Sequence, residues 1–535
     1  MKVNVKSDCR GWGVERVVKQ IFKDRNIKDP QHFLNPTIDD MLPLEDLENI
    51  DKAAEIVNHA IEYNYKIALL FDTDSDGVSS GTIIYRYLEM YGADVTPFID
   101  RNKQHGLQKN DLERYKPFQL LIIVDSLDAT AYLYEDVQKD SNIEDIIVLD
   151  HHAINEKVPY DKYITLVSSQ RNYGNSELSG AGVCWKFCKY LDKINNFDGA
   201  DQLVDLAAVG IISDMMDMTV PENRYIANEG LKGIINPALA KVGGGFSWDS
   251  KAIAFSVAPL INSANRLDHN ESAMKAFICD DNKELLIHVK VLKKCKEDQN
   301  KEIDSLMPDV LEQCKKQLDK KMMVVFIETD MGIAGLLGNK LLSKYKRPII
   351  ILKDDGDWYK GSMRAVGVDD FRQMINESKL GRSFGHELAA SCDVKKENIQ
   401  KFIDYMELHL PDVGSFEEEI EADVWVSAED IDRDYINRIQ EVNKISGTGF
   451  KPIKFYISGI TDYEITDMSK GKHLVIKLDD CDLNFIQWNF DGDWEELEDA
   501  AMMNDEIECV CELQANWIGR NFMLMAIIDW MRIKE

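Results

Sequence analysis

Three aspartates gather within five positions near the start of the chain. Asp72, Asp74 and Asp76 follow directly on the apolar run 66–71, in the stretch FDTDSDG. Carboxylates at this spacing repel one another, and the repulsion costs free energy unless positive charge lies among them. Carboxylate oxygens are the ligands that hard divalent cations prefer. The stretch therefore predicts a metal site at the end of a buried strand.

Other residues that could ligate a metal also follow apolar runs: Asp125, the triplet Asp150-His151-His152, and Asp214. Carboxylates combined with imidazole suit Mn²⁺, and they suit Mg²⁺ less well because histidine is a poor magnesium ligand. Acids that hold two cations about 3.5–4 Å apart are a standard device for phosphoryl transfer. The combined set predicts a site that hydrolyses phosphate esters.

Each of these elements also has a purely structural interpretation. An Asp-rich turn after a strand is more often a cap or a solvated loop. Asp125 could cap a helix, Asp214 could be a solvated turn residue, and adjacent histidines are more often structural. The metal interpretation is favoured because all the elements follow apolar runs, in the order expected of one sheet edge.

The elements that must position these residues alternate between apolar runs and helical stretches. The runs 66–71, 120–124 and 146–149 are continuous and mostly aliphatic, which is typical of buried parallel strands. Parallel sheets place ligand sites at the carboxyl ends of their strands. We therefore predict an α/β fold with a parallel sheet, preceded by a mostly helical segment over residues 1 to 64.

Composition narrows the classes of function. The 535 residues carry a net charge of -31, which argues against a broadly basic nucleic-acid surface. Part of that charge lies in the predicted metal site and part in the segment 412–434, so nucleic-acid binding must be decided locally. Ten scattered cysteines without a CxxC pair indicate reduced thiols. No apolar run reaches 18 residues and the first residues lack a signal peptide, so we expect a cytoplasmic protein.

The motifs together resemble the DHH phosphoesterase superfamily: Asp72-x-Asp74-x-Asp76-Gly77, Ile123-Val124-Asp125-Ser126, Asp150-His151-His152, and 210–214. Further stretches are similar to the RecJ branch of single-strand exonucleases and to its DHHA1 domain: 179–183, 260–267, 332–335, 360–364, 385–390 and 445–452. The resemblance covers nearly the whole chain, and the DHH set is its most specific part.

The resemblance implies roles for individual residues. The implied metal ligands are Asp72, Asp74, Asp76, Asp125, His151 and Asp214, holding two Mn²⁺ ions, with Mg²⁺ as an alternative. The implied catalytic residues are His152, Asp150 and Asp72. The implied substrate-binding residues are Arg266, Ser362, Arg364, Gly385 and His386.

The resemblance also implies a domain division. It comprises a DHH catalytic domain with a helical N-terminal segment (1–268), a long connecting helix (269–318), a smaller α/β DHHA1 substrate-binding domain (319–412), and a C-terminal OB-like β-barrel domain (413–535). The local patterns agree, because Lys and Glu are dense with helical periodicity over about 271–318 and short strands separated by turns follow residue 413.

The implied function is a metal-dependent 5′→3′ exonuclease that hydrolyses single-stranded DNA by a two-metal mechanism, in DNA repair, recombination or replication. RNA is an alternative substrate. Two other functions stay open: a phosphodiesterase for short oligonucleotides or cyclic dinucleotides, and an inactive nucleic-acid or replication scaffold. Few basic residues accompany the aromatic residues of the last 120 or so positions, so that part could instead dock a replication or single-strand-binding protein.

Overall fold

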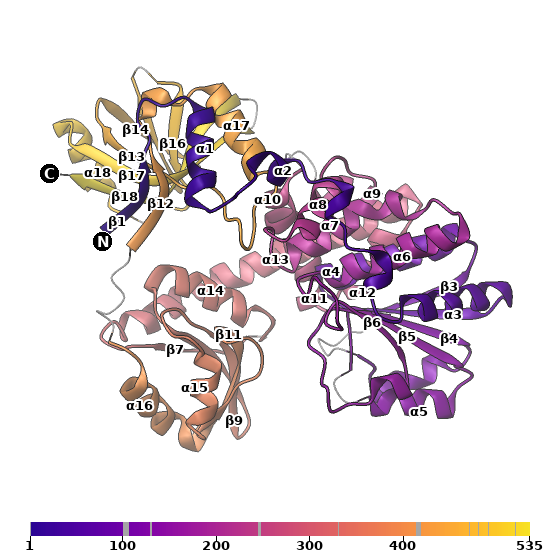
Figure 1. Cartoon of the computed structure of the whole chain (residues 1–535). Helices are drawn as coiled ribbons and strands as arrows, with labels where there is room; N and C mark the ends of the chain where they lie inside the picture. Colours follow the sequence, from indigo (N-terminus) through magenta and orange to yellow (C-terminus); the bar gives the residue numbers. More distant parts are fainter. Residues whose placement is uncertain are drawn as a thin grey trace. The chain divides into compact units, whose positions relative to one another are not determined.

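The computed structural model describes most of the chain (Figure 1), namely residues 2–99, 106–128, 131–243, 248–329, 331–412, 419–469, 471–479, 481–490, 492–518 and 521–534. The chain forms two compact units. The first unit comprises Met1–Ile261, Met274–Leu286 and Glu419–Glu535, and the second comprises Asn262–Ala273 and Ile287–Glu418. The division of the chain into four domains stays a prediction.

A five-stranded parallel sheet forms the centre of the first unit. Its strands lie in the order β3 (Asp94–Ile99), β2 (Lys66–Phe71), β4 (Leu120–Val124), β5 (Asp145–Asp150) and β6 (Thr165–Ser168). Every neighbouring pair is parallel. The predicted α/β class with a parallel sheet is therefore confirmed.

Helices cover both faces of this sheet (Figure 1). On one face α4 (Ser75–Met90) packs against β2 and β3, and α6 (Gly180–Asn195) packs against β5. Helix α7 (Val204–Ser213) packs against both of these helices. On the other face Tyr134 and Leu133 of α5 (Tyr132–Asp140) join a buried cluster with Leu70 and Ile123. Successive side chains of a strand point to opposite faces of the sheet. Since the strands are continuous apolar runs, both faces are apolar and the sheet is buried on both sides.

The expectation of a mostly helical start is wrong for the first residues. Lys2–Asp8 form strand β1, which pairs in parallel with β12 (Glu419–Trp425). Val3 and Val5 alternate with polar residues and pack in the cluster around Tyr456. A strand whose partner lies some 400 residues away has no local signal. The helices that follow are α1 (Val14–Asp24), α2 (Pro30–Leu34) and α3 (Ile50–Glu62).

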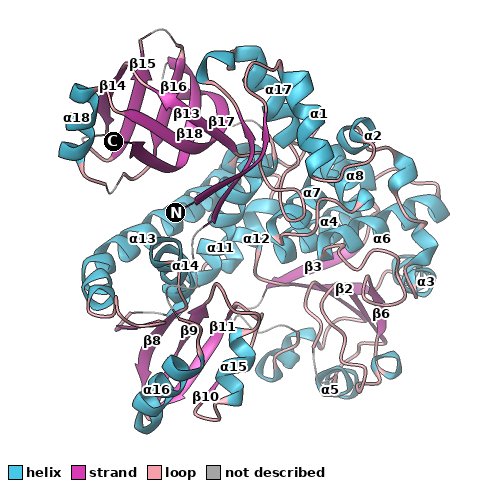
Figure 2. Ribbon diagram, turned by 60° about the vertical axis from the view of Figure 1, so that its left-hand side comes forward, coloured by secondary structure: helices cyan, strands magenta, loops and turns pink. Residues whose placement is uncertain are grey.

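The C-terminal part of the first unit is a mixed eight-stranded sheet (Figure 2), in which four neighbouring pairs are antiparallel and three are parallel. From edge to edge its order is β1, β12, β13 (Phe455–Ile460), β17 (Glu506–Ile518), β18 (Asn521–Lys534), β16 (Leu483–Gln487), β15 (His473–Leu478) and β14 (Tyr463–Met468). It carries α17 (Arg433–Asn443) and α18 (Trp494–Met503). This arrangement is consistent with the predicted OB-like domain.

The second unit holds a smaller α/β sheet. Its order is β10 (Gly381–Arg382), β11 (Ala389–Lys395), β9 (Trp358–Arg364), β8 (Ile349–Asp355) and β7 (Met323–Ile327). Helix α14 (Ala334–Tyr345) connects the parallel strands β7 and β8, and it packs against β8 and β9. The opposite face packs on α15 (Phe371–Glu377) and α16 (Ile399–His409).

The predicted long helix is α13 (Asn282–Lys315), which runs for 34 residues, and the boundary between the two units falls within it. Ile303, Val310 and Cys314 of this helix complete the core around β7 and β8. The helices between α7 and α13 are shorter: α8 (Pro221–Gly230), α9 (Pro237–Val242), α10 (Ser250–Ala252), α11 (Ala258–Arg266) and α12 (Asn270–Ile278). In the part of the chain that is described, no helix has the length and apolar character needed to span a membrane. All ten cysteines are free.

Candidate metal centre

The acidic residues singled out by the sequence meet at the carboxyl edge of the parallel sheet. Asp72 follows β2, Asp125 follows β4 and Asp150 is the last residue of β5. Asp74 is the N-cap of α4, and its side chain accepts a hydrogen bond from the Gly77 N–H at 3.0 Å. Asp214 is the C-cap of α7. One edge of the sheet and the ends of two helices therefore form the site, which lies wholly within the first unit.

A single imidazole nitrogen lies among three carboxylates. His151 Nε2 is 3.2 Å from Asp125 Oδ1, 3.4 Å from Asp214 Oδ2 and 3.6 Å from Asp76 Oδ2. Three overlapping groups have ligand atoms close enough to share a cation: Asp125 with His151 and His152, Asp76 with His151 and Asp214, and Asp72 with Asp74 and Asp125. These groups contain all six side chains that the resemblance implied as metal ligands. We call these three groups together the metal centre.

Backbone donors hold Asp76 in place. Its Oδ2 accepts a hydrogen bond from the Gly180 N–H at 2.8 Å, and its Oδ1 accepts one from the Ala181 N–H at 2.9 Å. These two N–H groups belong to the first turn of α6, where the helix dipole favours negative charge. The helix therefore stabilises this carboxylate at a fixed position before any cation binds.

Three glycines allow this close packing. A Cβ on Gly77 would lie 2.5 Å from Asp72 Cβ, and a Cβ on Gly180 would lie 2.5 Å from Asp125 Oδ1. A Cβ on Gly210 would lie 2.2 Å from Asp76 Oδ1. The sequence shows these glycines inside its motifs, but a spacing pattern does not reveal which carboxylate each one must accommodate.

Asp150 is placed differently from the other acids. Its Oδ1 accepts hydrogen bonds from the His151 N–H at 2.5 Å, the His152 N–H at 2.6 Å and His152 Nδ1 at 2.8 Å. Its Oδ2 accepts one from the Leu127 N–H at 2.6 Å. Asp150 belongs to none of the three groups that could share a cation. Its position suits it to orient the two histidines.

The Asp150 and His152 side chains are coupled. Burial opposes the charge on Asp150, but the hydrogen bonds from His152 and the charges of His152 and His151 together outweigh it and lower the pKa of Asp150 to about 2. Burial likewise opposes the charge on His152, but the hydrogen bond to Asp150 and the charges of Asp150, Asp72 and Asp214 together raise the pKa of His152 to about 9. The pair therefore favours an ionised carboxylate beside an imidazolium when no cation is bound.

Two carboxyl groups of the metal centre have raised pKa values, in contrast to Asp150. Burial and then the charges of Asp76 and Asp74 raise the pKa of Asp214 to about 8. The same causes raise the pKa of the fully buried Asp125. Asp125 also has a positive φ of 55°, a conformation that costs free energy for a side-chain-bearing residue. Repulsion and strain of this kind are tolerated at sites whose ligand compensates for them.

The donor set fits a divalent cation. Asp125 Oδ1 is buried and receives no hydrogen bond from any described residue. An acceptor oxygen left in this state is costly unless a cation takes it. Carboxylate oxygens with imidazole nitrogen form a hard-to-borderline set, which suits Mn²⁺ and admits Mg²⁺. Ser126 orients the neighbouring ligand, since its Oγ donates to Asp72 Oδ1 at 3.2 Å and accepts from the Gly106 N–H at 2.8 Å.

The residues implied in substrate binding lie in the second unit, apart in the sequence from the metal ligands. Arg364 ends β9, and its guanidinium donates to Ser362 Oγ at 2.9 Å and to Asn339 Oδ1 at 2.8 Å. Burial and the charge of Arg364 lower the pKa of Arg266. These residues form a basic group.

Gly385 and His386 form a tight turn beside that basic group. Gly385 has φ 128° and bridges to Ala390, and the His386 N–H donates to the Ala389 oxygen at 3.2 Å. Ala389 pairs with Arg364 in the sheet, so the turn lies at the same end of β9. Within the described part of the chain, no hydrogen bond joins the exposed His386 to Arg364 or Ser362.

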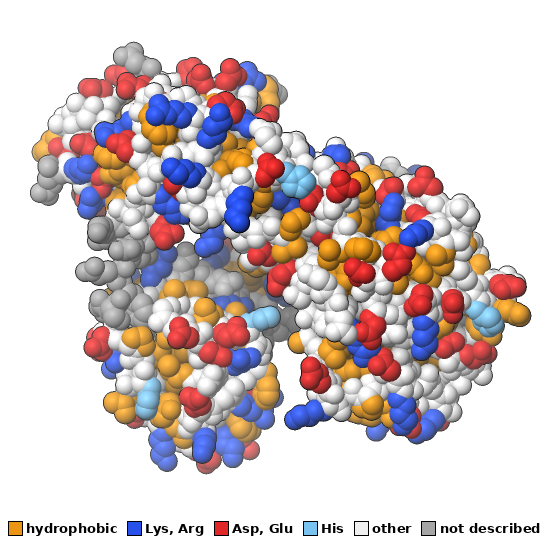
Figure 3. All heavy atoms as spheres, viewed as in Figure 1, with side chains coloured by type: hydrophobic (Ala, Val, Ile, Leu, Met, Phe, Trp, Pro, Cys, Tyr) orange, Lys and Arg blue, Asp and Glu red, His pale blue; other side chains and the backbone are white. Residues whose placement is uncertain are grey.

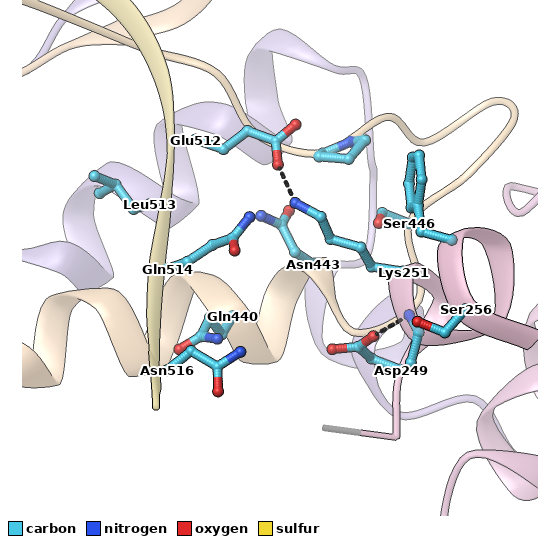
Figure 4. A pocket seen from close by; sticks show the side chains of 13 residues that line it. Asp249, Lys251, Ser256, Gln440, Asn443, Ser446, Glu512, Leu513, Gln514 and Asn516 are labelled. Atoms are coloured by element: carbon cyan, nitrogen blue, oxygen red, sulfur yellow. Dashed lines mark hydrogen bonds and ion pairs between the residues drawn. The ribbon is translucent and has the colours of Figure 1, made fainter. Parts of the chain in front are cut away.

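A pocket of about 210 Å³ lies elsewhere in the first unit (Figure 4). It is lined by residues of 249–256 on one side and by α17 and β17 on the other. Lys251 and Glu512 form an ion pair of 3.0 Å across it. Gln440 exchanges hydrogen bonds with the backbone of Ala515. The pocket shares no residue with the metal centre.

The surface offers no broad basic stripe on the face seen in Figure 3, where the coloured acidic and basic side chains are interspersed. The whole chain has 94 acidic and 63 basic residues. Any contact with nucleic acid must therefore depend on a local group of cations rather than on the net charge.

Comparison with known proteins agrees with the motifs. Residues 66–211 match the N-terminal domain of the DHH family. The chain is 27% identical over 517 residues to a putative SPbeta prophage-derived single-strand DNA-specific exonuclease, YorK of Bacillus subtilis, covering 89% of this chain and 88% of that protein. It is 25% identical over 530 residues to the single-stranded-DNA-specific exonuclease RecJ of Bacillus subtilis, covering 93% of this chain and 65% of that protein.

Solved structures show the same fold. The structure of RecJ in complex with Mn²⁺ from Thermus thermophilus matches with a TM-score of 0.77 at 22% identity, covering 97% of this chain and 76% of that one. A structure of exonuclease RecJ bound to manganese matches with a TM-score of 0.59 at 24% identity, covering 70% of this chain and 98% of that one. Residues 66–211 therefore match a DHH family domain, the fold is RecJ-like, and the resemblance that the motifs indicated is confirmed.

Proposed function

We propose that this protein is a metal-dependent exonuclease that shortens single-stranded DNA from its 5′ end. The observation that carries the proposal is the metal centre, in which His151 Nε2 lies within 3.6 Å of three carboxylates. The relatives support the choice of substrate, because they are named single-strand DNA-specific exonucleases. A role in DNA repair, recombination or replication and a cytoplasmic location follow as predictions.

Two divalent cations are proposed to occupy the overlapping groups of the metal centre. Asp72, Asp74 and Asp125 would hold one, and Asp76, His151 and Asp214 would hold the other. Divalent cations bound there supply Lewis-acid chemistry for phosphodiester hydrolysis. Mn²⁺ suits the mixed oxygen and nitrogen ligands best.

His152 is proposed to donate a proton or stabilise a negatively charged phosphate, and Asp150 is proposed to orient the His152 ring. The His152 side chain is 40% exposed, so its ring reaches the surface of the site while Nδ1 stays bonded to Asp150. An imidazolium with a raised pKa can donate a proton to the leaving oxygen or stabilise a negatively charged phosphate. Asp150 fixes the orientation of the ring that performs this step.

Arg364, Ser362 and Arg266 are proposed to bind backbone phosphate in the second unit. The Arg364 guanidinium is fixed by Asn339 and Ser362, which leaves it pre-organised for an oxyanion. The turn at Gly385 and His386 would add a further contact at that end of the sheet. The four-domain division proposed from the sequence assigns Ser362, Arg364, Gly385 and His386 to the DHHA1 domain, and it assigns Arg266 to the end of the DHH catalytic domain.

The proposal is tested with single-stranded DNA labelled at either the 5′ or the 3′ end, incubated with Mn²⁺ or Mg²⁺ and separated on a gel. We expect wild type to release short products from the 5′ end, and Asp214→Asn to lose this activity. Asp214 is a suitable target because its side chain is 35% exposed and its backbone, rather than its carboxylate, caps α7. Asp140→Asn, on the exposed end of α5, is the matched control and should remain active.

The other outcomes identify the alternatives. If single-stranded DNA stays intact with either metal while dinucleotides are cleaved, the protein is a phosphodiesterase of short substrates. If neither is cleaved, the protein is a scaffold. Products released from the 3′ end would reverse the proposed polarity, and equal cleavage of RNA would broaden the substrate.

A further inference from the structure

The metal ligand Asp214 is held differently from its neighbour Asp76. The Asp76 carboxylate accepts hydrogen bonds from two backbone N–H groups of α6. No hydrogen bond joins the Asp214 carboxylate to any residue that the structure describes, and the charges of Asp76 and Asp74 repel it. The position of Asp214 in the metal centre therefore depends on the backbone that carries it.

That backbone turns sharply directly after Asp214. The Met215 N–H donates to the Ile212 oxygen at 3.3 Å, and the Met216 N–H donates to the Ile211 oxygen at 3.1 Å. These two bonds are a usual closure of a helix C-terminus. Met215 has a φ of 59°, in the left-handed region where glycine is favoured and a side chain is costly. A turn of this kind needs support from the residues that follow it.

Residues 445–450, which we call the 445–450 loop, supply that support. The Met218 N–H donates to the Thr448 oxygen at 2.9 Å. Gly449 lies directly against Asp217, since a Cβ on Gly449 would lie 1.9 Å from Asp217 Oδ1. The loop thus packs on the chain only a few residues beyond Asp214. It belongs to a stretch that resembled the RecJ branch in sequence and that the proposed reaction leaves without a role.

Arg224 joins the same two segments from inside the protein. Its Nη1 donates to the Ile445 oxygen at 3.0 Å and to the Met218 oxygen at 3.4 Å. Its Nε donates to the Phe33 oxygen at 2.5 Å, and its guanidinium lies 3.6 Å from the centre of the Phe33 ring. Arg224 is only 2% exposed. A buried cation is costly unless its donors are used, and here they bind backbone oxygens of three segments.

The 445–450 loop is itself firmly anchored. Phe450 is buried, and its ring centre lies 4.8 Å from that of Phe33 on α2 and 6.1 Å from that of Phe22 on α1. The Gly447 N–H donates to the Phe450 oxygen at 2.8 Å, which closes the loop on itself. The loop therefore presents a rigid surface to the segment that follows Asp214.

We infer that the 445–450 loop positions Asp214 and thereby sets the affinity of the metal centre for a divalent cation. None of the residues of the loop belongs to the metal centre, so they act through residues 215–219 as positioning residues. This inference rests on the proposed function and deepens it. It assigns to the C-terminal part of the first unit a role in metal binding.

The first test compares two glycines whose backbone has the same conformation. Gly449 has φ 75° and Gly459 has φ 74°, so alanine strains the backbone alike at both positions. A Cβ on Gly449 meets Asp217, whereas a Cβ on Gly459 meets nothing within 4 Å. Mn²⁺ is titrated into each full-length protein, and free Mn²⁺ is followed by its EPR signal. Gly449→Ala should weaken Mn²⁺ binding by roughly tenfold, as loss of a group that orients a metal ligand does, and Gly459→Ala should keep the wild-type affinity.

Thermal unfolding separates positioning from folding. In EDTA both alanine variants should lower the unfolding midpoint, since alanine in a left-handed conformation is destabilising in either place. Only Gly449→Ala should also reduce the rise of the midpoint when Mn²⁺ is added, because that rise reports binding to the folded protein. An equal reduction in both variants would show a general effect of backbone strain and would overturn the inference.

Asp217 offers a second variant that adds no atoms and so does not depend on Gly449→Ala folding. Its Oδ1 accepts hydrogen bonds from the Thr219 N–H and from the Thr219 hydroxyl, both at 2.7 Å. Asp217→Ala removes these bonds and should weaken Mn²⁺ binding several-fold. Asp217→Asn keeps an acceptor oxygen and should restore the affinity. Equal weakening by both would mean that the charge of Asp217 affects the cation directly, and it would contradict the positioning role.

A double variant shows whether the loop acts through Asp214. In Asp214→Asn the carboxylate ligand is already lost, so the addition of Gly449→Ala should weaken Mn²⁺ binding no further. Losses that add up in the double variant would mean that the loop acts on another part of the site. That result would overturn the inference.

The failure of this inference is distinguishable from the failure of the proposed function. Wild-type Mn²⁺ affinity in both Gly449→Ala and Asp217→Ala would overturn the inference alone. If the variants weaken Mn²⁺ binding as expected but wild type leaves single-stranded DNA intact, the exonuclease function is wrong and the inference stands. Wild type that binds no Mn²⁺ would overturn both.

Discussion

The metal centre and a cation cluster of the second unit, made up of Arg266, Lys296, Lys340 and Arg364, gather like charges by opposite means. In the metal centre, backbone N–H groups and glycines hold carboxylates in the buried edge of a sheet, and Asp125 is only 1% exposed. In the cation cluster, neutral side chains such as Asn339 and Gln299 hold long, partly exposed cations. Both arrangements cost free energy when empty, and each is suited to a counterion of the opposite sign.

The difference in burial between the two sites predicts which of them is more sensitive to single substitutions. Charges in a buried, rigid site act at a low effective dielectric constant and cannot be replaced by a neighbour. Partly exposed cations are screened by water and salt, and each shares its task with others. We therefore expect single substitutions to act strongly in the metal centre and moderately in the cation cluster.

The largest effect is expected for Asp125→Asn. The substitution removes one charge shared by two of the groups that could hold a cation. Cleavage of 5′-labelled single-stranded DNA in Mn²⁺ should slow by on the order of 10³-fold, the loss typical of a pre-organised electrostatic group. The unfolding midpoint in EDTA should not fall, because a buried carboxyl among like charges has been neutralised. Activity within tenfold of wild type would contradict the role of Asp125.

Gly210→Ala should have the next largest effect. The added Cβ would lie 2.2 Å from Asp76 Oδ1 and 2.4 Å from Ala181 Cβ, and both neighbours are fixed by α6. Displacing this ligand should lower activity by roughly 10–100-fold, as loss of a group that orients a metal ligand does. Gly233→Ala is the control, because a Cβ there meets nothing within 4 Å. The two variants are compared by the Mn²⁺ concentration that gives half-maximal cleavage.

In the cation cluster, Arg364→Met should act mainly on binding. The variant removes charge-assisted hydrogen bonds to a phosphate, each worth about 1.5–3 kcal/mol, and neighbouring cations offset part of the loss. KM for single-stranded DNA should rise by about tenfold while kcat changes less. Steady-state kinetics over a range of DNA concentrations measures both. A fall in kcat with KM unchanged would place Arg364 in the chemical step instead.

The smallest effect expected is a pH dependence of the stabilisation by Mn²⁺. The raised pKa values of Asp125 and Asp214, the latter about 8, mean that the folded metal-free protein binds more protons than the unfolded chain above about pH 4. Its stability therefore falls as pH rises towards 8. The raised pKa of His152, about 9, acts in the same direction above pH 6.5.

Mn²⁺ removes this repulsion, so the rise in unfolding midpoint on adding Mn²⁺ should be larger at pH 8 than at pH 5, by a few degrees. Thermal unfolding with Mn²⁺ and with EDTA at the two pH values provides the measurement. Asp214→Asn should flatten the dependence. A gain that is equal at both pH values would show that these carboxyl groups do not couple to the cation.

The sequence by itself determined the sheet edge and the kind of chemistry found there. Asp72, Asp125 and Asp150 each follow a continuous apolar run, and parallel strands bring their carboxyl ends to one edge whatever the loops between them do. His151 and Asp214 joined this set because they too follow apolar runs, and the resemblance of the motifs then implied their roles as ligands. The helical periodicity over about 271–318 likewise predicted a long helix, because that signal is local. The structure has this helix over Asn282–Lys315, with a separate short helix, Asn270–Ile278, before it.

Tertiary structure decided the features that depend on contacts between distant segments. The pairing of β1 with β12, the N–H groups that bind Asp150, and the carboxylates that lie against Gly180 and Gly210 have no local signal. Lys296 and Gln299 look like ordinary residues of a charged helix. Their significance lies in what surrounds them: among the described residues, Lys296 has no acidic partner and the buried Gln299 Nε2 has no acceptor. Burial, repulsion and hydrogen-bond satisfaction are properties of the three-dimensional neighbourhood, and only the folded chain creates that neighbourhood.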